Sequence, residues 1–171
     1  MTRIARIAAS AAMLAGLANP ALAGQACNGS VQASLLQAVP DPLVVALQNA
    51  RNTAKAKQAA ANFTEGLRAA GLTVQLNGAS VLHLTFLVTT LGSGGQLHEY
   101  SDFSWTAAPV AAGSPPTITV TAGLTSRGMA TLLWVASLEC RVKTRDPTAL
   151  AKELGQIIGQ VLGKQVDQKA F

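Results

Sequence analysis

The spacing of the apolar residues changes at Gly71, and this change restricts the chain to folds that combine helices with a sheet. Before Gly71, apolar side chains recur every three or four residues, which is the period of a helix. After it, they alternate with polar side chains, which is the period of a strand. A helical pattern returns after Asp146. Helices at both ends of a run of strands indicate an α+β fold.

A long helix is predicted from Asp41 to about Ala70. Asp41 is a favourable N-cap, and Pro42 suits the first helical position. Good helix formers fill the segment, and Gly71 provides a C-terminal stop. The apolar stripe changes register near Asn52, so we expect a bend or a division there. Most of the stripe is alanine, which favours close packing against a neighbouring element over a binding groove.

Five strands are predicted after this helix. They cover residues 72–76, 81–90, 96–105, 117–122 and 131–143. The first two are expected to form a hairpin through Asn77-Gly78, a favoured two-residue turn. The last strand has apolar residues on both sides, which is typical of a central strand.

The closing helix is expected to begin at Asp146-Pro147 and to continue to about Val166, with an apolar stripe that starts at Leu150. One or two further helical turns are expected within residues 30–39. Short connections favour an antiparallel sheet of about five strands, with the long N-terminal helix and the amphipathic C-terminal helix packed on one face. Residues 24–171 then form a single α+β domain.

The first 23 residues have the layout of a bacterial-type secretory signal peptide. Arg3 and Arg6 give a positive start, an apolar run follows, and a small-x-small cleavage signal ends at Ala23. The apolar run is shorter than the roughly 20 residues that span a bilayer, and it is interrupted before Pro20. Removal of 23 residues from 171 leaves 148, without a transmembrane span. We expect the mature protein in the periplasm or outside the cell.

Both cysteines, Cys27 and Cys140, lie beyond the cleavage site. In an oxidising compartment, an even pair favours a disulfide, which here would close most of the mature chain. One alternative is a pair of free thiols, although no histidine or other cysteine lies at ligand spacing. The other is a lipoprotein acylated at Cys27, although residues 24–26 lack the aliphatic side chain expected upstream of such a cysteine.

The charge of the chain does not favour a nucleic-acid partner. Thirteen lysines and arginines oppose eight acidic residues, and the leader contains two of the cations. The others are scattered, with small groups only at 55–57 and 141–145. Nucleic-acid interfaces normally have a denser basic face, often with aromatic residues between the cations.

Three polar residues are candidates for chemistry: His83, His98 and Asp102. His98 and Asp102 would lie on one side of a strand, and His83 would face His98 if the two strands formed a hairpin. Such a group would suit general-base catalysis or a metal. The alternative, which we favour, is a charged edge strand and a surface histidine. The chain has no nucleophile elbow and no phosphate-binding glycine loop, so no cofactor is predicted.

These observations leave three functional hypotheses. The leading one is a non-enzymatic envelope protein that binds another envelope protein or supports an assembly. The second is a carrier of a small apolar or lipid-like ligand, held between the alanine-rich helix and the sheet near Leu82, Phe86 and Trp134. The third is a small hydrolase or metalloprotein that uses His83, His98 and Asp102.

Overall fold

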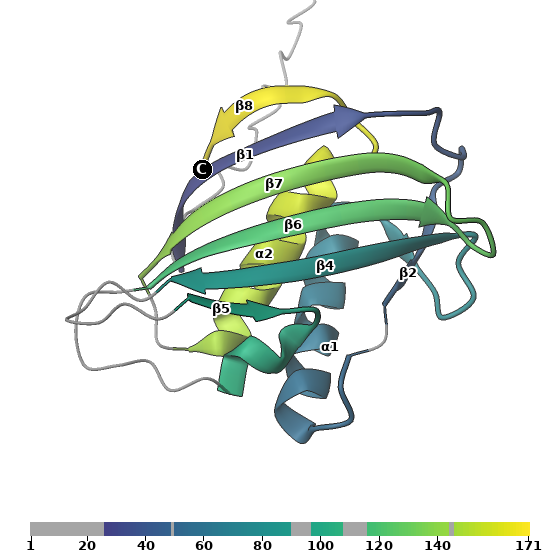
Figure 1. Cartoon of the computed structure of the whole chain (residues 1–171). Coiled ribbons are helices and arrows are strands. Elements are labelled where there is room, and N and C mark those ends of the chain that lie inside the picture. The colour runs from purple at the N-terminus through teal and green to yellow at the C-terminus, as the bar shows by residue number, and fades with distance from the viewer. Residues whose placement is uncertain (1–25, 49, 90–96, 108–115, 144–145) are drawn as a thin grey trace, which may run out of the picture.

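The computed structural model describes residues 26–171, except for 49, 90–96, 108–115 and 144–145 (Figure 1). Within these residues the chain forms one mixed sheet and two α-helices. The strands are β1 Cys27–Leu35, β2 Val44–Leu47, β3 Thr73–Val74, β4 Ser80–Thr89, β5 Leu97–Tyr100, β6 Thr117–Ser126, β7 Leu132–Val142 and β8 Val166–Ala170. The helices are α1 Ala54–Ala69, α2 Pro147–Val161 and the short 3₁₀ helix η1 Phe103–Ala107.

The strand order is β3-β2-β4-β6-β7-β1-β8, and β5 also pairs with β4. All pairs are antiparallel except those of β2, which runs parallel to both β3 and β4. The first residues of β4 pair with β2, and its last residues pair with β5. The predicted α+β class is confirmed, but the sheet has eight strands within the described residues and is not purely antiparallel.

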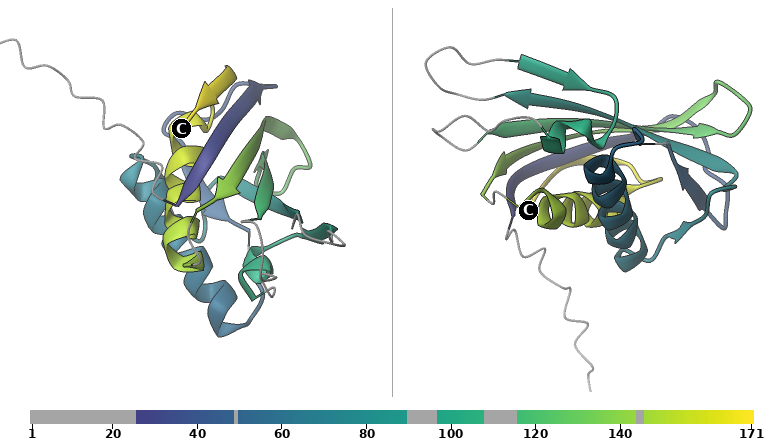
Figure 2. Two further views of the ribbon diagram at one scale, coloured as in Figure 1. Left: turned by 90° about the vertical axis from the view of Figure 1, so that its left-hand side faces the viewer. Right: turned by 90° about the horizontal axis from the view of Figure 1, so that it is seen from below.

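Both α-helices cover the same face of the sheet (Figure 2). Side chains alternate along β4, and Leu82, Leu84, Phe86 and Val88 are buried on the helix side. β7 lies between β6 and β1, which confirms it as a central strand, and its Trp134 is among the largest fully buried side chains. The core therefore lies between the sheet and the helix pair.

The two helices pack with their backbones in contact. A Cβ atom at Gly155 of α2 would collide with the backbone of Phe63 on α1, and one at Gly66 would collide with the backbone near Lys152. Buried alanines, such as Ala56 and Ala59, lie on α1. Part of the predicted stripe, including Ala56, Phe63 and Leu67, is buried as a packing face would be, but the backbone contacts with α2 are made at glycines.

The predicted long helix at 41–70 is wrong as far as Thr53. Residues 44–47 form β2, and α1 begins only at Ala54, with Thr53 as its N-cap. The Thr53 hydroxyl accepts a hydrogen bond from the amide of Ala56 at 3.2 Å. Val45 and Ala46 are buried within the sheet, so tertiary burial outweighs the helix-start signal at Asp41-Pro42. The change in register of the apolar stripe near Asn52 marks the true start of α1.

The predicted hairpin at Asn77-Gly78 is also wrong, because β2 lies between β3 and β4. The turn carries the chain over the backbone of β2 to reach the other side of that strand. A Cβ atom at Gly78 would lie 2.6 Å from the amide nitrogen of Ala46. Glycine at this position permits a close approach of two backbones.

The strands β1 and β8 lie in segments that the sequence analysis predicts as helical or leaves unassigned. Residues 30–39 were expected to contain helical turns, but β1 occupies most of this segment and pairs with β7 from Cys27↔Val142 to Leu35↔Trp134. The closing helix begins at Asp146-Pro147 as predicted, but it ends at Val161. β8 then pairs with β1. The strand expected at 96–105 is shorter, and η1 follows it.

The predicted disulfide is present between Cys27 of β1 and Cys140 of β7. Both residues are fully buried, and their Cα atoms are 5.5 Å apart. A sulfur in this bond is not available for acylation or metal binding. The two alternatives for Cys27, a free thiol and an acylated lipoprotein cysteine, therefore do not agree with the structure. Among the described helices, none has the length and apolar character needed to cross a bilayer.

Candidate functional site

His83 lies on β4, on the face of the sheet that points away from the helices. Its Nε2 atom is 2.9 Å from the hydroxyl oxygen of Thr125 on the neighbouring strand β6, within hydrogen-bond distance. Thr125 Oγ1 is also 3.5 Å from the carbonyl oxygen of Val81. The His83 side chain is therefore part of a polar contact between β4 and β6 on the surface of the sheet.

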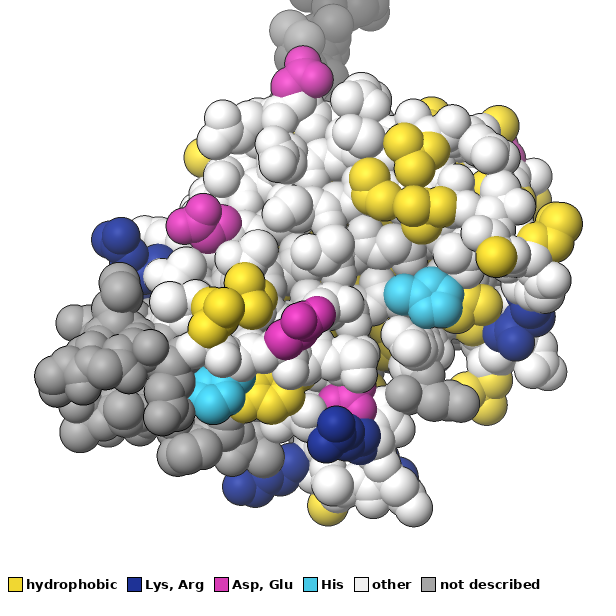
Figure 3. Space-filling view, in the orientation of Figure 1, with side chains coloured by type: hydrophobic (Ala, Val, Ile, Leu, Met, Phe, Trp, Pro, Cys, Tyr) yellow, Lys and Arg dark blue, Asp and Glu magenta, His cyan; other side chains and the backbone are white. Residues whose placement is uncertain are grey.

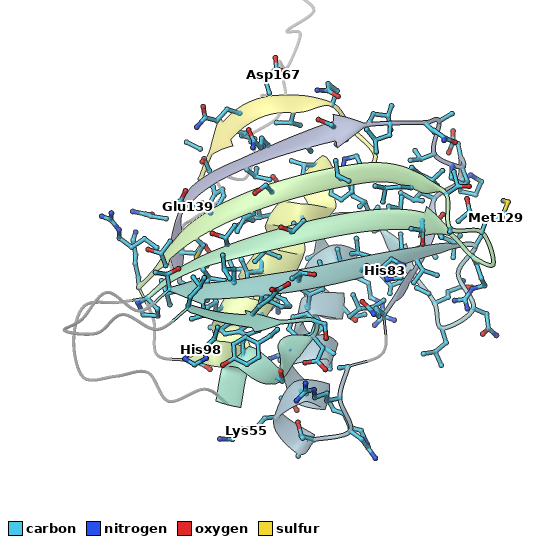
Figure 4. The ribbon with its side chains drawn as sticks, viewed as in Figure 1. Lys55, His83, His98, Met129, Glu139 and Asp167 are labelled. Atoms are coloured by element: carbon cyan, nitrogen blue, oxygen red, sulfur yellow. A yellow bond between two sulfur atoms is a disulfide. The ribbon has the colours of Figure 1, made fainter. Side chains whose placement is uncertain are left out.

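The two histidines are not brought together. His98 on β5 pairs with Val88, which is five residues beyond His83 along β4. This offset corresponds to roughly 16 Å along a strand. Figure 4 shows His83 along the right-hand half of β4 and His98 below the left-hand part of that strand. His98 stacks instead on Tyr100, with ring centroids 6.1 Å apart.

Asp102 holds the segment before α1 against η1. Its carboxylate accepts hydrogen bonds from the amide of Arg51 at 3.1 Å and from the amide of Ser104 at 2.8 Å. The Nε atom of Arg51 adds an ion pair at 3.4 Å. The Asp102 side chain is only 11% exposed, whereas that of Arg51 is 67% exposed. Within the described residues, no group of three or more histidine, cysteine or acidic side chains has a metal-binding arrangement.

The residues proposed to line an apolar-ligand site lie in the core between the helices and the sheet. Leu82, Phe86 and Trp134 are fully buried. Phe103 from η1 packs on Phe86 and on Phe63, with centroid distances of 5.0 and 5.2 Å. The indole of Trp134 donates a hydrogen bond to the carbonyl of Lys164 at 3.0 Å. The side chains proposed to line a ligand site are therefore part of the hydrophobic core.

Glu153 is a polar contact that the sequence analysis did not identify. It lies on α2, and its Oε2 atom accepts a hydrogen bond from the amide of Ala26 at 2.8 Å. Burial raises the pKa of this carboxyl, and the opposing effects of the Ala26 and Cys27 amides and of Lys143 are smaller. The sequence signal is a carboxylate on a strongly amphipathic helix. This contact fastens the start of β1 to α2.

One end of the sheet carries most of the exposed large apolar side chains. We call it the hairpin end; it comprises the β6–β7 hairpin, the end of β1, the segment from there to β2, the β3–β4 turn, and the ends of α1 and α2. Six large apolar side chains are exposed in the described part of the chain. Five lie at the hairpin end: Leu35, Leu36, Leu76, Met129 and Leu132. The sixth, Leu97, is on β5 at the opposite end.

The two most exposed side chains at the hairpin end lie on separate loops that are fastened together. Leu76, in the β3–β4 turn, is 90% exposed, and Met129, in the β6–β7 hairpin, is 62% exposed. The Arg127 guanidinium donates hydrogen bonds to the carbonyls of Leu76 at 2.8 Å and of Gly78 at 2.7 Å. Figure 3 shows apolar side chains gathered toward the right-hand side, where Figure 4 labels Met129.

Basic side chains outnumber acidic ones at the hairpin end. Arg68, Arg127 and Lys164 lie in or next to its loops, whereas Asp41 is the one acidic residue in the segments that form it. Arg68 donates to the carbonyl of Val74, and Lys164 donates to that of Gln160. These acceptors are neutral carbonyls, so each side chain retains its full positive charge.

Comparison with known proteins gives no family for this chain. No family model and no curated protein match it. Among solved structures, it is similar to the PelC dodecamer from Paraburkholderia phytofirmans in two crystal forms. The first has 18% identity over 80% of this chain and 98% of the PelC chain, with a TM-score of 0.45. The second has 17% identity over 80% of this chain and 99% of the PelC chain, with a TM-score of 0.44. A PDZ domain protein from Parabacteroides distasonis matches 87% of this chain and 40% of its own, with 8% identity and a TM-score of 0.52. The likeness to the PDZ domain protein concerns the fold alone, and that to PelC supports no conclusion about function.

Proposed function

We propose that this protein is an exported, non-enzymatic binding domain of the bacterial cell envelope, and that the hairpin end is its contact surface. The observation that carries the proposal is the gathering of five of the six exposed large apolar side chains at one end of the sheet. Apolar side chains exposed singly are common, but a group of them with polar surroundings marks an interaction site.

The placement of the polar candidates supports a binding role over an enzymatic one. His83 contacts Thr125, His98 stacks on Tyr100, and Asp102 fastens a loop to η1. His83 and His98 lie on different parts of the sheet, and Asp102 lies beyond the end of β5. A general base and its partner would need to lie within hydrogen-bond reach of one substrate.

Export is supported by the leader pattern and by the disulfide. Buried disulfides are typical of oxidising compartments, and Cys27–Cys140 joins the first strand to a central one. Intact mass measurement of the protein purified from the envelope fraction tests this part of the proposal. We expect a chain that begins at Gly24 with two fewer hydrogens than the reduced form. A full-length chain found in the cytoplasm would contradict export.

Site-specific photo-crosslinking tests the contact surface. A photoreactive residue at Met129 is compared with one at Leu97, which has a similar exposure of 67% but lies on β5. We expect one defined adduct, to protein or lipid, from position 129 and none from position 97. The same adduct from both positions, or none from position 129, would contradict a contact surface at the hairpin end.

A further inference from the structure

We propose that the partner of the hairpin end is a lipid bilayer surface that carries negative charge. This inference rests on the proposed function, because it names the partner of the same surface.

The shape of the hairpin end suits a lipid surface. Leu36 follows β1, Leu76 lies in the β3–β4 turn and Met129 lies in the β6–β7 hairpin, so the exposed side chains come from three separate segments. Protein interfaces are commonly anchored by aromatic side chains that fill pockets of the partner. The exposed large apolar side chains here are leucine and methionine only. The boundary between lipid headgroups and acyl chains can receive separate protruding side chains.

The charge of the hairpin end indicates which lipid headgroups it would bind. Hydrogen bonds to backbone carbonyls hold Arg127 beside Leu76 and Arg68 beside Val74, and Lys164 follows α2 at the same end of the sheet. Asp41 opposes them, and the C-terminal ends of α1 and α2 add about half a negative charge each. The three full positive charges exceed these contributions. Basic side chains beside an apolar surface are attracted to anionic headgroups.

The bonds of Arg127 reduce the cost of binding. They join the β6–β7 hairpin to the β3–β4 turn, so Leu76 and Met129 are fixed relative to each other before contact. Less conformational freedom is then lost when both side chains enter the interface.

Vesicle co-sedimentation of the mature chain tests the inference. Vesicles of phosphatidylglycerol and phosphatidylethanolamine are compared with phosphatidylcholine vesicles at low and high salt. We expect binding to the anionic vesicles to be about fivefold stronger, from a net charge of about +1 at the hairpin end, and to weaken with salt. We expect L76S/M129S to weaken this binding by about tenfold or more, because it removes two apolar side chains from the contact.

The matched control is Leu97→Ser, which removes a similarly exposed leucine at the opposite end and should leave vesicle binding unchanged. Circular dichroism and thermal unfolding establish that each variant folds. Equal binding to both kinds of vesicle, or no effect of L76S/M129S, would overturn the inference. A protein adduct at position 129 without vesicle binding would overturn it while leaving the proposed function intact. Self-association that L76S/M129S abolishes, again without vesicle binding, would point to a second copy of the chain.

Discussion

Glu153 shows how a single carboxylate joins distant parts of this chain. It lies on α2, yet it accepts a hydrogen bond from Ala26, immediately before β1. Burial raises its pKa above the ordinary value of 4.5, so charging it is less favourable in the folded protein than in the unfolded chain. The contact is therefore sensitive to pH.

The first prediction concerns Glu153→Gln. Between pH 4.5 and the raised pKa, the folded protein binds more protons than the unfolded chain, so Glu153 makes the free energy of unfolding fall as pH rises through this window. The glutamine retains an oxygen for the Ala26 amide but does not ionise. We expect the variant to lose this slope and to be at least as stable as the wild type at neutral pH, as measured by urea unfolding across a pH series. Glu139→Gln, at an exposed position on β7, should retain the slope. An unchanged slope in Glu153→Gln would contradict the role of burial.

The second prediction concerns Asp102→Ala. The variant loses two hydrogen bonds from backbone amides and the ion pair with Arg51. We expect a loss of about 1–2 kcal/mol in the free energy of unfolding, most of it from the amide bonds. Arg51→Ala is the control and should cost less than about 1 kcal/mol, because the arginine is mostly exposed. Chemical unfolding of both variants measures the difference, and equal losses would show that the ion pair dominates.

The candidate polar residues show what sequence can predict at this scale. Alternation along a strand correctly places His83 on the side opposite Leu82 and Phe86. It does not give the register between strands, and β5 pairs only with the last residues of β4. His98 is therefore displaced from His83 along the sheet. Asp102 lies beyond the end of β5, so alternation along that strand no longer describes it.

At the scale of elements, contact between α1 and α2 depends on glycines within helices. Glycine weakens a helix by about 1 kcal/mol relative to alanine, so its presence on a packed face indicates that space is limiting. At Gly155, the space for a Cβ atom is occupied by the backbone of Phe63, which cannot move as a flexible side chain would.

The third prediction concerns Gly155→Ala. The added methyl group would force the two helices apart, and we expect the free energy of unfolding to fall by about 1–3 kcal/mol despite the better helix propensity of alanine. Lys152→Ala on the same helix is the control, because it removes only an exposed ion pair with Glu65. Thermal and urea unfolding compare the two variants. A Gly155→Ala protein as stable as the wild type would show that the helices are not in backbone contact.

The elements that sequence patterns predicted best are those whose periodicity and capping agree. β4 alternates cleanly, and α2 combines an Asp146 cap with an apolar stripe, so both were assigned correctly at their N-terminal ends to within a residue. β2 was missed because a helix-start signal precedes Val44 and good helix formers follow it. β8 was missed because it is a short, mostly exposed edge strand without alternation. The hairpin error at Gly78 arose because a local turn signal does not show which strand lies beside it.

At the scale of the whole molecule, the sheet has two different faces. The helices cover one face, whereas the described part of the other presents mostly small polar side chains. A row across its centre consists of Thr85, Thr121, Ser137 and Gln32, which are paired in register across β4, β6, β7 and β1. This face of the sheet carries few charges. The row across its centre has no exposed large apolar side chain. The contrast with the hairpin end is a further reason to place binding there.

The disulfide fastens this architecture between its first strand and a central one. Cys27 and Cys140 are 113 positions apart, and the bond restricts the whole segment between them when the chain is unfolded. The chain-entropy model assigns such a loop about 4–5 kcal/mol. This is close to the lower limit of the net stability of a typical domain, about 5–15 kcal/mol.

The fourth prediction therefore concerns the disulfide itself. We expect C27A/C140A to lose about 3–5 kcal/mol in the free energy of unfolding, because its unfolded chain is no longer restricted. Urea unfolding of the wild type and of the variant, each with and without a reductant, measures the loss. Reduction leaves both sulfur atoms in place, so it separates the effect of the cross-link from that of the lost sulfur volume. The reduced wild type should approach the variant in stability, and the variant should not respond to the reductant. A loss below about 1 kcal/mol in the reduced wild type would show that other contacts between β1 and β7, and not the cross-link, hold the first strand in the sheet.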